Sequence, residues 1–171
     1  MGLPIQHFIA ATNANDVVPE YLLSGVFTPR PSIPTLSNAM DVGNPSNFAR
    51  MMDLYGSTWN NLKADISGYA CSDDATKQAL EEVYRNFGYT IDPHGAVGYL
   101  ALKEFQKKQP GTKGVILETA HPSKFLPDVE AILGQAVEVP ERLAVLANKK
   151  KIALQMGTGF TPFKQWLLSN Y

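Results

Sequence analysis

The chain has 171 residues, with 15 Lys and Arg against 16 Asp and Glu, and 44% of its residues are hydrophobic. This length fits one globular domain, or most of one, with enough apolar content for a core. The near-zero net charge argues against a nucleic-acid-binding surface, and no apolar stretch approaches the roughly 18 residues that a membrane span needs. The amino terminus lacks the pattern of a signal peptide, so we expect a cytoplasmic protein.

An apolar run rich in β-branched and aromatic residues predicts a strand over residues 3–11. Apolar side chains at helical spacing behind polar caps predict two helices, over residues 17–24 and 48–55. The segment between them, residues 26–46, carries four prolines and is predicted to be irregular. A loop of that length inside a compact domain is often functional.

The middle of the chain predicts a strand over residues 66–70, followed by helices over residues 75–87 and 94–107. Gly95 and Gly98 lie near the start of the second helix. Because glycine has no side chain, they allow another segment to approach the helix backbone closely.

Residues 114–120 form a continuous apolar run that ends in a polar residue, as in strands buried on both faces of a parallel sheet. The alternation of strands and helices predicts an α/β fold, with residues 3–11, 66–70 and 114–120 in one mostly parallel sheet and helices on both faces. The remaining predicted elements are a helix over 126–133, a short strand over 137–139, a helix over 140–148, a strand over 152–156 and a helix over 161–168.

Ligands of open parallel sheets bind outside the carboxyl ends of the strands. The candidates are therefore residues 12–16 and 119–124, which follow two of the predicted strands. Turn and capping roles explain Asn13, Asn15 and Asp16 at least as well, and a hydroxyl bonded to the backbone explains Thr119 equally well. No reaction follows from composition and spacing alone.

Cysteine and histidine predict no metal site. Cys71 is the single cysteine and has no obvious activating base, so it is expected to be a buried, unreactive thiol. No two of His7, His94 and His121 have the i, i+4 spacing that places two ligands on one helix face.

Five stretches resemble threonine synthase, of the group found in many bacteria and in fungi. They occur in the family's order and with its spacings, and they cover the chain from Gly2 to about Val139. The stretches are GLPIQHFIAATNANDVVP (2–19), TLSNAMDVGNPSNFARM (35–51), GYACSDDAT (68–76), DPHGAVGYLAL (92–102) and ETAHPSKF (118–125).

The resemblance implies a pyridoxal-phosphate (PLP) enzyme of the tryptophan-synthase-β fold type, fold type II, with a three-layer αβα architecture. It implies conversion of O-phosphohomoserine and water into threonine and phosphate, with a lysine Schiff base and a cofactor that acts as electron sink. In the family this lysine and the cofactor-phosphate loop lie upstream of the GLP stretch. We therefore expect residues 1–171 to be the C-terminal part of the catalytic region, without the covalent step when alone. The family's lysine motif is not matched at Lys63, Lys77, Lys103, Lys107, Lys108, Lys113, Lys124 or Lys164.

The resemblance also implies roles for five side chains. Thr119 is implied to face the pyridine nitrogen of the cofactor, as a hydroxyl that does not hold that nitrogen protonated. Ser37 and Asn38 are implied to lie near the substrate, with donors suited to phosphate or carboxylate oxygens. Lys124 could supply positive charge for the substrate phosphate, with a solvated lysine as the equal alternative, and His94 lies in a family segment near the active site.

The alternative hypothesis is a non-catalytic α/β module that binds a small anionic ligand or a partner protein. The missing lysine favours a module without catalytic activity. The dense motif match favours a chain that originates from a threonine synthase. The reading frame upstream of Met1 would discriminate between them. A truncated sheet would also leave an edge or an apolar surface uncovered, which predicts self-association.

Overall fold

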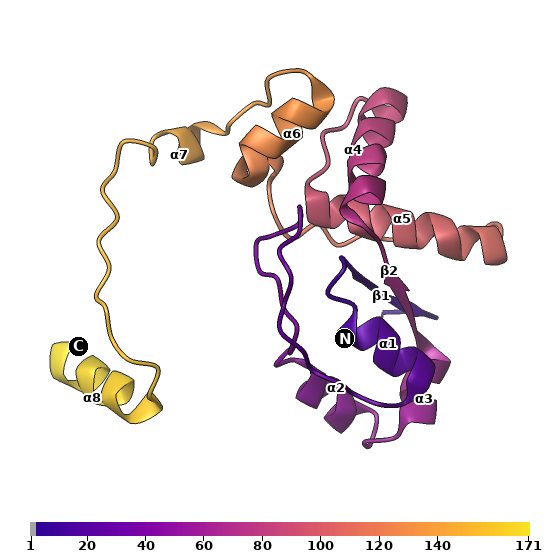
Figure 1. Ribbon diagram of the computed structural model, residues 1–171, viewed down its shortest axis with the longest axis horizontal. Coiled ribbons are helices and arrows are strands. Elements are labelled where there is room, and N and C mark those ends of the chain that lie inside the picture. Colours follow the sequence, from indigo (N-terminus) through magenta and orange to yellow (C-terminus); the bar gives the residue numbers. More distant parts are fainter. Residues whose placement is uncertain (1–2) are drawn as a thin grey trace. The chain divides into compact units, whose positions relative to one another are not determined.

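The computed structural model describes residues 3–171. The chain divides into two compact units, with the boundary between Glu138 and Val139. No helix in residues 3–171 is both long enough and apolar enough to cross a membrane. In the first unit the elements are β1 (Phe8–Thr12), α1 (Val17–Ser24), α2 (Phe48–Leu54), α3 (Trp59–Asp65), β2 (Ile66–Ala70), α4 (Asp73–Phe87), α5 (Pro93–Lys108), the short 3-10 helix η1 (Pro122–Phe125) and α6 (Leu126–Leu133) (Figure 1). The second unit contains α7 (Glu141–Ala144) and α8 (Phe160–Asn170).

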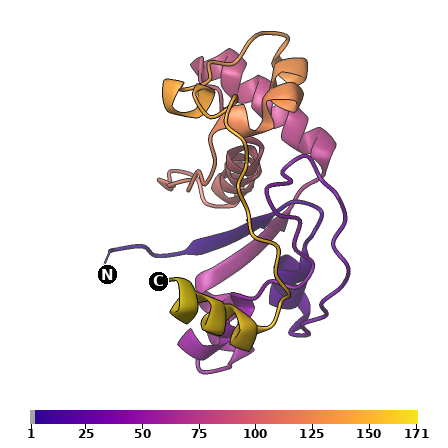
Figure 2. The same cartoon turned by 90° about the vertical axis from the view of Figure 1, so that its left-hand side faces the viewer.

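The sheet consists of β1 and β2, which lie side by side and pair in parallel (Figure 2). Helix α1 packs on one face, where Pro19 lies against Gly68 of β2. Helix α5 packs on the other face, where the ring of Phe105 stacks on that of His7 at 5.1 Å between centroids, just before β1. The predicted α/β class, with parallel strands and helices on both faces, is confirmed.

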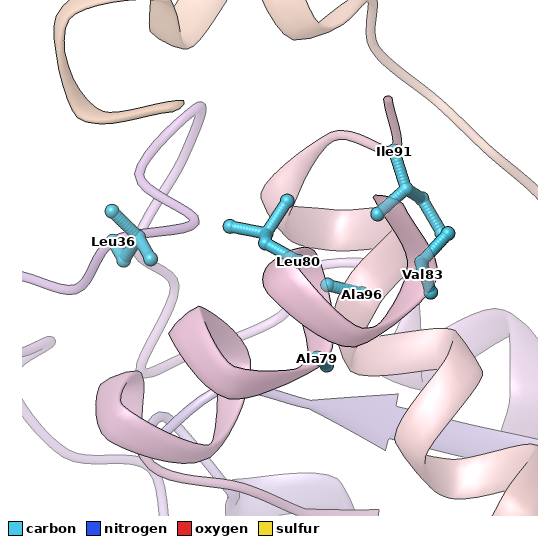
Figure 3. Packing of buried hydrophobic residues seen from close by; sticks show 6 residues of the cluster. All are labelled: Leu36, Ala79, Leu80, Val83, Ile91 and Ala96. Atoms are coloured by element: carbon cyan, nitrogen blue, oxygen red, sulfur yellow. The ribbon is translucent and has the colours of Figure 1, made fainter. Parts of the chain in front are cut away.

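Two clusters of buried apolar side chains support this arrangement. The cluster under α1 includes Tyr21 and Phe48, whose rings meet edge to face at 4.8 Å between centroids. The second cluster joins α4 and α5 to the irregular segment 26–46 through Leu36, which lies on the α4 side of that segment (Figure 3). The prolines of the segment prevent regular structure, but its buried leucine fixes it to the helices. The second cluster comprises Leu36, Ala79, Leu80, Val83, Ile91 and Ala96.

Most predicted helices are confirmed, because their end signals form the expected contacts. The Ser72 hydroxyl accepts a hydrogen bond from the Ala75 amide at the start of α4, and Gly88 ends that helix in the left-handed conformation. Helix α3 was not predicted, because its sequence, WNNLKAD, offers little apolar periodicity. Its formation depends on tertiary packing, since Leu62 in it is fully buried.

The structure corrects three predicted strands, since residues 114–120, 137–139 and 152–156 pair with no strand in the described chain. The prediction of one sheet containing residues 3–11, 66–70 and 114–120 is therefore wrong for its third member. An apolar run becomes a strand only where a neighbouring strand supplies hydrogen-bond partners, and none lies beside these runs. Val115 and Leu117 are consequently 88% and 81% exposed. Smaller corrections concern the first strand, which begins at Phe8, and the helix predicted over 140–148, which is α7 followed by turns.

The close approach of α1 to β2 gives a stability prediction. A side chain on Gly68 would place its Cβ 2.6 Å from the Cα of Pro19. We expect Gly68→Ala to lower the free energy of unfolding by about 1–3 kcal/mol, because backbone rather than a flexible side chain must move. Denaturant unfolding followed by circular dichroism measures this change. The matched control is Gly157→Ala, where a Cβ would meet nothing within 4 Å; an equal loss in both variants would contradict the packing described.

Candidate functional site

A pocket of about 330 Å³ lies at the carboxyl end of β1, where the sequence predicts ligand binding. It is bounded by β1, the first turn of α1, the irregular segment, α2 and the start of α5, and all of these belong to the first unit. Among its lining residues, His94 is the one ionisable side chain and none is a lysine. The polar lining residues are Thr12, Asn13, Asn15, Ser37, Asn47 and His94, and the others are apolar.

Asn13 connects the end of β1 to the irregular segment. Its amide nitrogen donates to the hydroxyls of Thr35 and Ser37, both at 2.9 Å. Its carbonyl oxygen accepts the backbone amide of Asn15 at 2.9 Å, which closes a local turn. The turn role that explained this asparagine is confirmed, and the same side chain also positions Ser37 at the pocket wall.

Asp41 and Asp73 hold the rest of this segment. One carboxylate oxygen of Asp41 accepts from the Thr35 hydroxyl at 2.7 Å, and the other accepts from the Thr35 backbone amide at 3.2 Å. Asp73, at the start of α4, accepts the backbone amide of Leu36 at 3.0 Å. Ser37 directly follows these two anchored residues, Thr35 and Leu36, and is buried, although it belongs to a segment without regular structure.

The start of α5 supplies the histidine of the pocket. Asp92, fully buried, caps the helix by accepting the backbone amides of His94 and Gly95. The same carboxylate lies 2.9 Å from the His94 ring nitrogen Nδ1. The ring is one-quarter exposed and packs against Phe125 of η1 at 5.2 Å between centroids.

The extended segment before η1 lies along the first turns of α5. A Cβ on Gly95 would come within 2.5 Å of the Glu118 carboxylate, and one on Gly98 within 2.8 Å of the Ile116 side chain. The close approach predicted from these two glycines is confirmed, and the approaching segment is residues 116–118. The Tyr89 hydroxyl donates to Glu118 at 2.5 Å, and this hydrogen bond raises the pKa of Tyr89.

The structure brings together two of the five side chains to which the resemblance gives roles. Ser37 and His94 both line the pocket. Thr119 and Lys124 are exposed and lie outside its lining, although their neighbours Glu118 and Phe125 contact the start of α5. Asn38 is also exposed and outside the lining, one residue beyond Ser37.

Two sets of contacts in the site were not predicted from the sequence, namely the bond between Asp92 and the His94 ring and the bonds of Asp41. Capping by Asp92 is expected of a residue before Pro93 at a helix start, but its bond to the His94 ring was not predicted, although the Asp-Pro-His spacing makes that bond available. Asp41 lies in the resembling stretch 35–51 but was given no role, because its partners at positions 13, 15 and 35 meet it only in the folded chain.

Cys71 is buried, as predicted, and its burial raises the pKa of the thiol. Its sulfur lies 3.5 Å from the Thr76 hydroxyl, beside the end of β2. In residues 3–171 no three His, Cys, Asp or Glu side chains gather in a way that could hold a metal ion.

The family model and the curated relatives that match this chain are all of threonine synthase. Residues 95–159 match the family model described as threonine synthase, C-terminal. The threonine synthase of Escherichia coli is 40% identical over 170 residues, which cover 99% of this chain and 39% of the relative. That of Serratia marcescens is 41% identical over 98% of this chain and 38% of the relative. The chain thus spans about two fifths of the length of these curated relatives.

Solved structures agree with the sequence comparison. The crystal structure of threonine synthase from E. coli superposes with a TM-score of 0.83 at 39% identity, covering 99% of this chain and 39% of that one. The crystal structure of PLP-bound threonine synthase from Brucella melitensis gives a TM-score of 0.75 at 27% identity, covering 98% and 41%. In sequence and in fold, this chain is similar to about two fifths of these threonine synthases, and its residues 95–159 match the model of their C-terminal region.

Proposed function

We propose that this chain supplies the C-terminal part of a PLP-dependent threonine synthase, which converts O-phosphohomoserine and water into threonine and phosphate. The observation that carries the proposal is the match to the E. coli enzyme over 99% of the chain, at 40% sequence identity and a TM-score of 0.83. A cytoplasmic location, expected from the sequence, is part of the proposal.

In this proposal the residues that line the pocket at the end of β1 form one wall of the substrate site. Ser37 offers a hydroxyl and His94 a ring nitrogen to polar atoms of the substrate. Asn38 and Lys124 belong to the same site and contact the carboxylate or phosphate of the substrate. Both are exposed, which leaves them free to do so.

The residues present supply only part of what PLP requires. The cofactor provides an electron sink when bound, and Thr119 would face its pyridine nitrogen. The exposed hydroxyl of Thr119 suits that role, but the pocket lining contains no lysine for covalent attachment. The described residues therefore do not form a complete cofactor site, and the proposal assigns no chemical step to the cofactor in this chain alone.

A hybrid enzyme tests the proposal. In it, this chain replaces the matched two fifths of the E. coli threonine synthase. We expect the hybrid to restore growth without threonine in an E. coli strain that lacks its own threonine synthase. The control carries the same relative with the matched part deleted. A hybrid that is folded and soluble but supports no growth would contradict the proposal.

The absence of a lysine from the pocket gives a prediction for the chain alone. Mixing it with PLP and reducing with borohydride should attach no stoichiometric pyridoxyl group to any one lysine, because no lysine is among the described residues that line the pocket. Absorbance spectroscopy and peptide mass spectrometry measure the adduct. Stoichiometric trapping on a single lysine would show that the chain carries its own attachment site.

We also propose that the chain self-associates when alone. The support is twofold: Val115 and Leu117 are more than four-fifths exposed, and the sheet in residues 3–171 has only two strands, so its edges are open. Light scattering after size exclusion should show dimers or larger species. The double variant Val115→Thr, Leu117→Thr should shift the population toward monomer, and a monomeric parent chain would contradict this proposal.

A second candidate function is a ligand-binding module without catalysis. It is favoured by one observation, namely a pocket lined by five amide or hydroxyl side chains and a histidine, but by no lysine. Calorimetry with inorganic phosphate and with L-homoserine distinguishes the two. Tight binding by the chain alone, together with an inactive hybrid, would favour the module.

A further inference from the structure

The Asp92 carboxylate accepts more hydrogen bonds than helix capping needs. It receives the backbone amides of His94 at 2.9 Å and Gly95 at 3.3 Å, which satisfy the first turn of α5. The third contact, to Nδ1 of the His94 ring at 2.9 Å, is additional. A carboxylate can only accept, so Nδ1 must be the donor in this pair.

This assignment determines what the rest of the ring can do. In a neutral imidazole only one nitrogen carries hydrogen, so Nε2 of His94 has a free electron pair. The ring lines the pocket, and it is the one ionisable group among the lining side chains. A histidine whose tautomer is fixed by a buried carboxylate, with its second nitrogen available, is the arrangement used for proton transfer by general bases.

Within residues 3–171, Asp92 is the charged group that hydrogen-bonds to the ring, and the charged groups of the neighbouring segments have other contacts or are exposed. Glu118, from the extended segment, lies against Gly95 and accepts from Tyr89. Asp41 accepts hydrogen bonds from the side chains of Asn15 and Thr35. Lys124 precedes Phe125, which packs on the ring, but its own side chain is exposed.

We propose that His94 is the proton donor and acceptor of the pocket and that Asp92 is its positioning residue. The Nε2 electron pair takes a proton from a small polar ligand seated beside Ser37, and the ligand keeps the electrons of the broken bond. The resulting imidazolium has both nitrogens protonated and is stabilised by the Asp92 carboxylate. The reverse transfer restores the neutral ring. The identity of the ligand rests on the proposed function, whereas the state of the ring does not.

The tautomer of His94 tests the first part of this inference. We expect long-range ¹H–¹⁵N spectra of the chain at about pH 8, where a free imidazole is neutral, to show His94 protonated on Nδ1. His121 is an internal control of the opposite state, because the Ser123 amide donates to its Nδ1 at 3.2 Å and leaves the hydrogen on Nε2. His94 protonated on Nε2 would overturn the inference.

Asp92→Asn separates positioning from capping. Asparagine is as good a helix cap as aspartate, so α5 should remain intact by circular dichroism. Its amide can, however, donate to Nδ1 as well as accept from it, so the Nδ1-protonated population of His94 should fall. A tautomer that is unchanged in this variant would show that the negative charge of Asp92 does not fix the ring, because the asparagine oxygen can still accept from Nδ1.

Ligand addition tests the second part. With O-phosphohomoserine as the probe, the Nε2 signal of His94 should move toward the imidazolium position while the signals of His121 stay in place. Ser37→Ala, which removes a hydroxyl from the same pocket, should weaken this response. No movement at His94 would overturn its role toward the ligand. The tautomer measurement needs no turnover, so an inactive hybrid enzyme would overturn the proposed function and leave the assignment of the ring intact.

Discussion

Replacing Thr119 by alanine in the hybrid enzyme is expected to lower turnover by on the order of 10²–10³, the loss typical of removing one well-placed polar group at a reacting centre. In the proposed function this hydroxyl faces the pyridine nitrogen of the cofactor. Its exposure in the chain indicates that little of the fold depends on it. Steady-state release of phosphate measures the effect, and circular dichroism shows whether the variant is folded.

Two further substitutions at this position sharpen the result. Thr119→Ser keeps the hydroxyl and should retain most of the activity. Thr119→Asp should be worse than alanine, because a carboxylate favours the protonated pyridine and diverts the reaction. If Thr119→Ala turned over at the parent rate, the hydroxyl would have no role toward the cofactor.

Asp92→Ala is expected to destabilise the chain strongly, with a loss of about 3 kcal/mol in the free energy of unfolding. The side chain is fully buried and accepts two backbone amides and the His94 ring, all of which lose their partner. Denaturant unfolding of the chain measures the loss.

Ser72→Ala is the matched control, because Ser72 also caps a helix but forms a single exposed bond, to the Ala75 amide. It should cost about 1 kcal/mol. Equal losses for the two variants would mean that the bond to His94 and the burial of Asp92 add nothing to the cap.

Helices were predicted well where their signals are local. Ser72, Gly88 and Gly134 mark helix ends through contacts within a few residues, so sequence alone suffices for α4 and α6. The strand predicted over residues 114–120 failed for the opposite reason. Its apolar run has the composition of a buried strand, but a strand also needs a neighbour, and composition does not reveal whether one is present.

The same distinction separates the predicted and unpredicted parts of the site. The carboxyl end of β1 could be identified from sequence, because ligands of parallel sheets bind at a position set by topology. The roles of Ser37 and His94 were implied by the resemblance, and both residues line the pocket. The hydrogen bonds of Asp41 to residues 13 and 15 span more than 25 positions in the sequence, and no local pattern predicts them.

The most direct test of the central claim is the purified hybrid enzyme supplied with PLP and O-phosphohomoserine. The claim is that this chain can replace the C-terminal part of a threonine synthase in an active enzyme. We predict that the hybrid releases phosphate and forms threonine in equal amounts, whereas the E. coli enzyme without its matched part forms neither. A folded hybrid that binds PLP but releases no phosphate would contradict the claim.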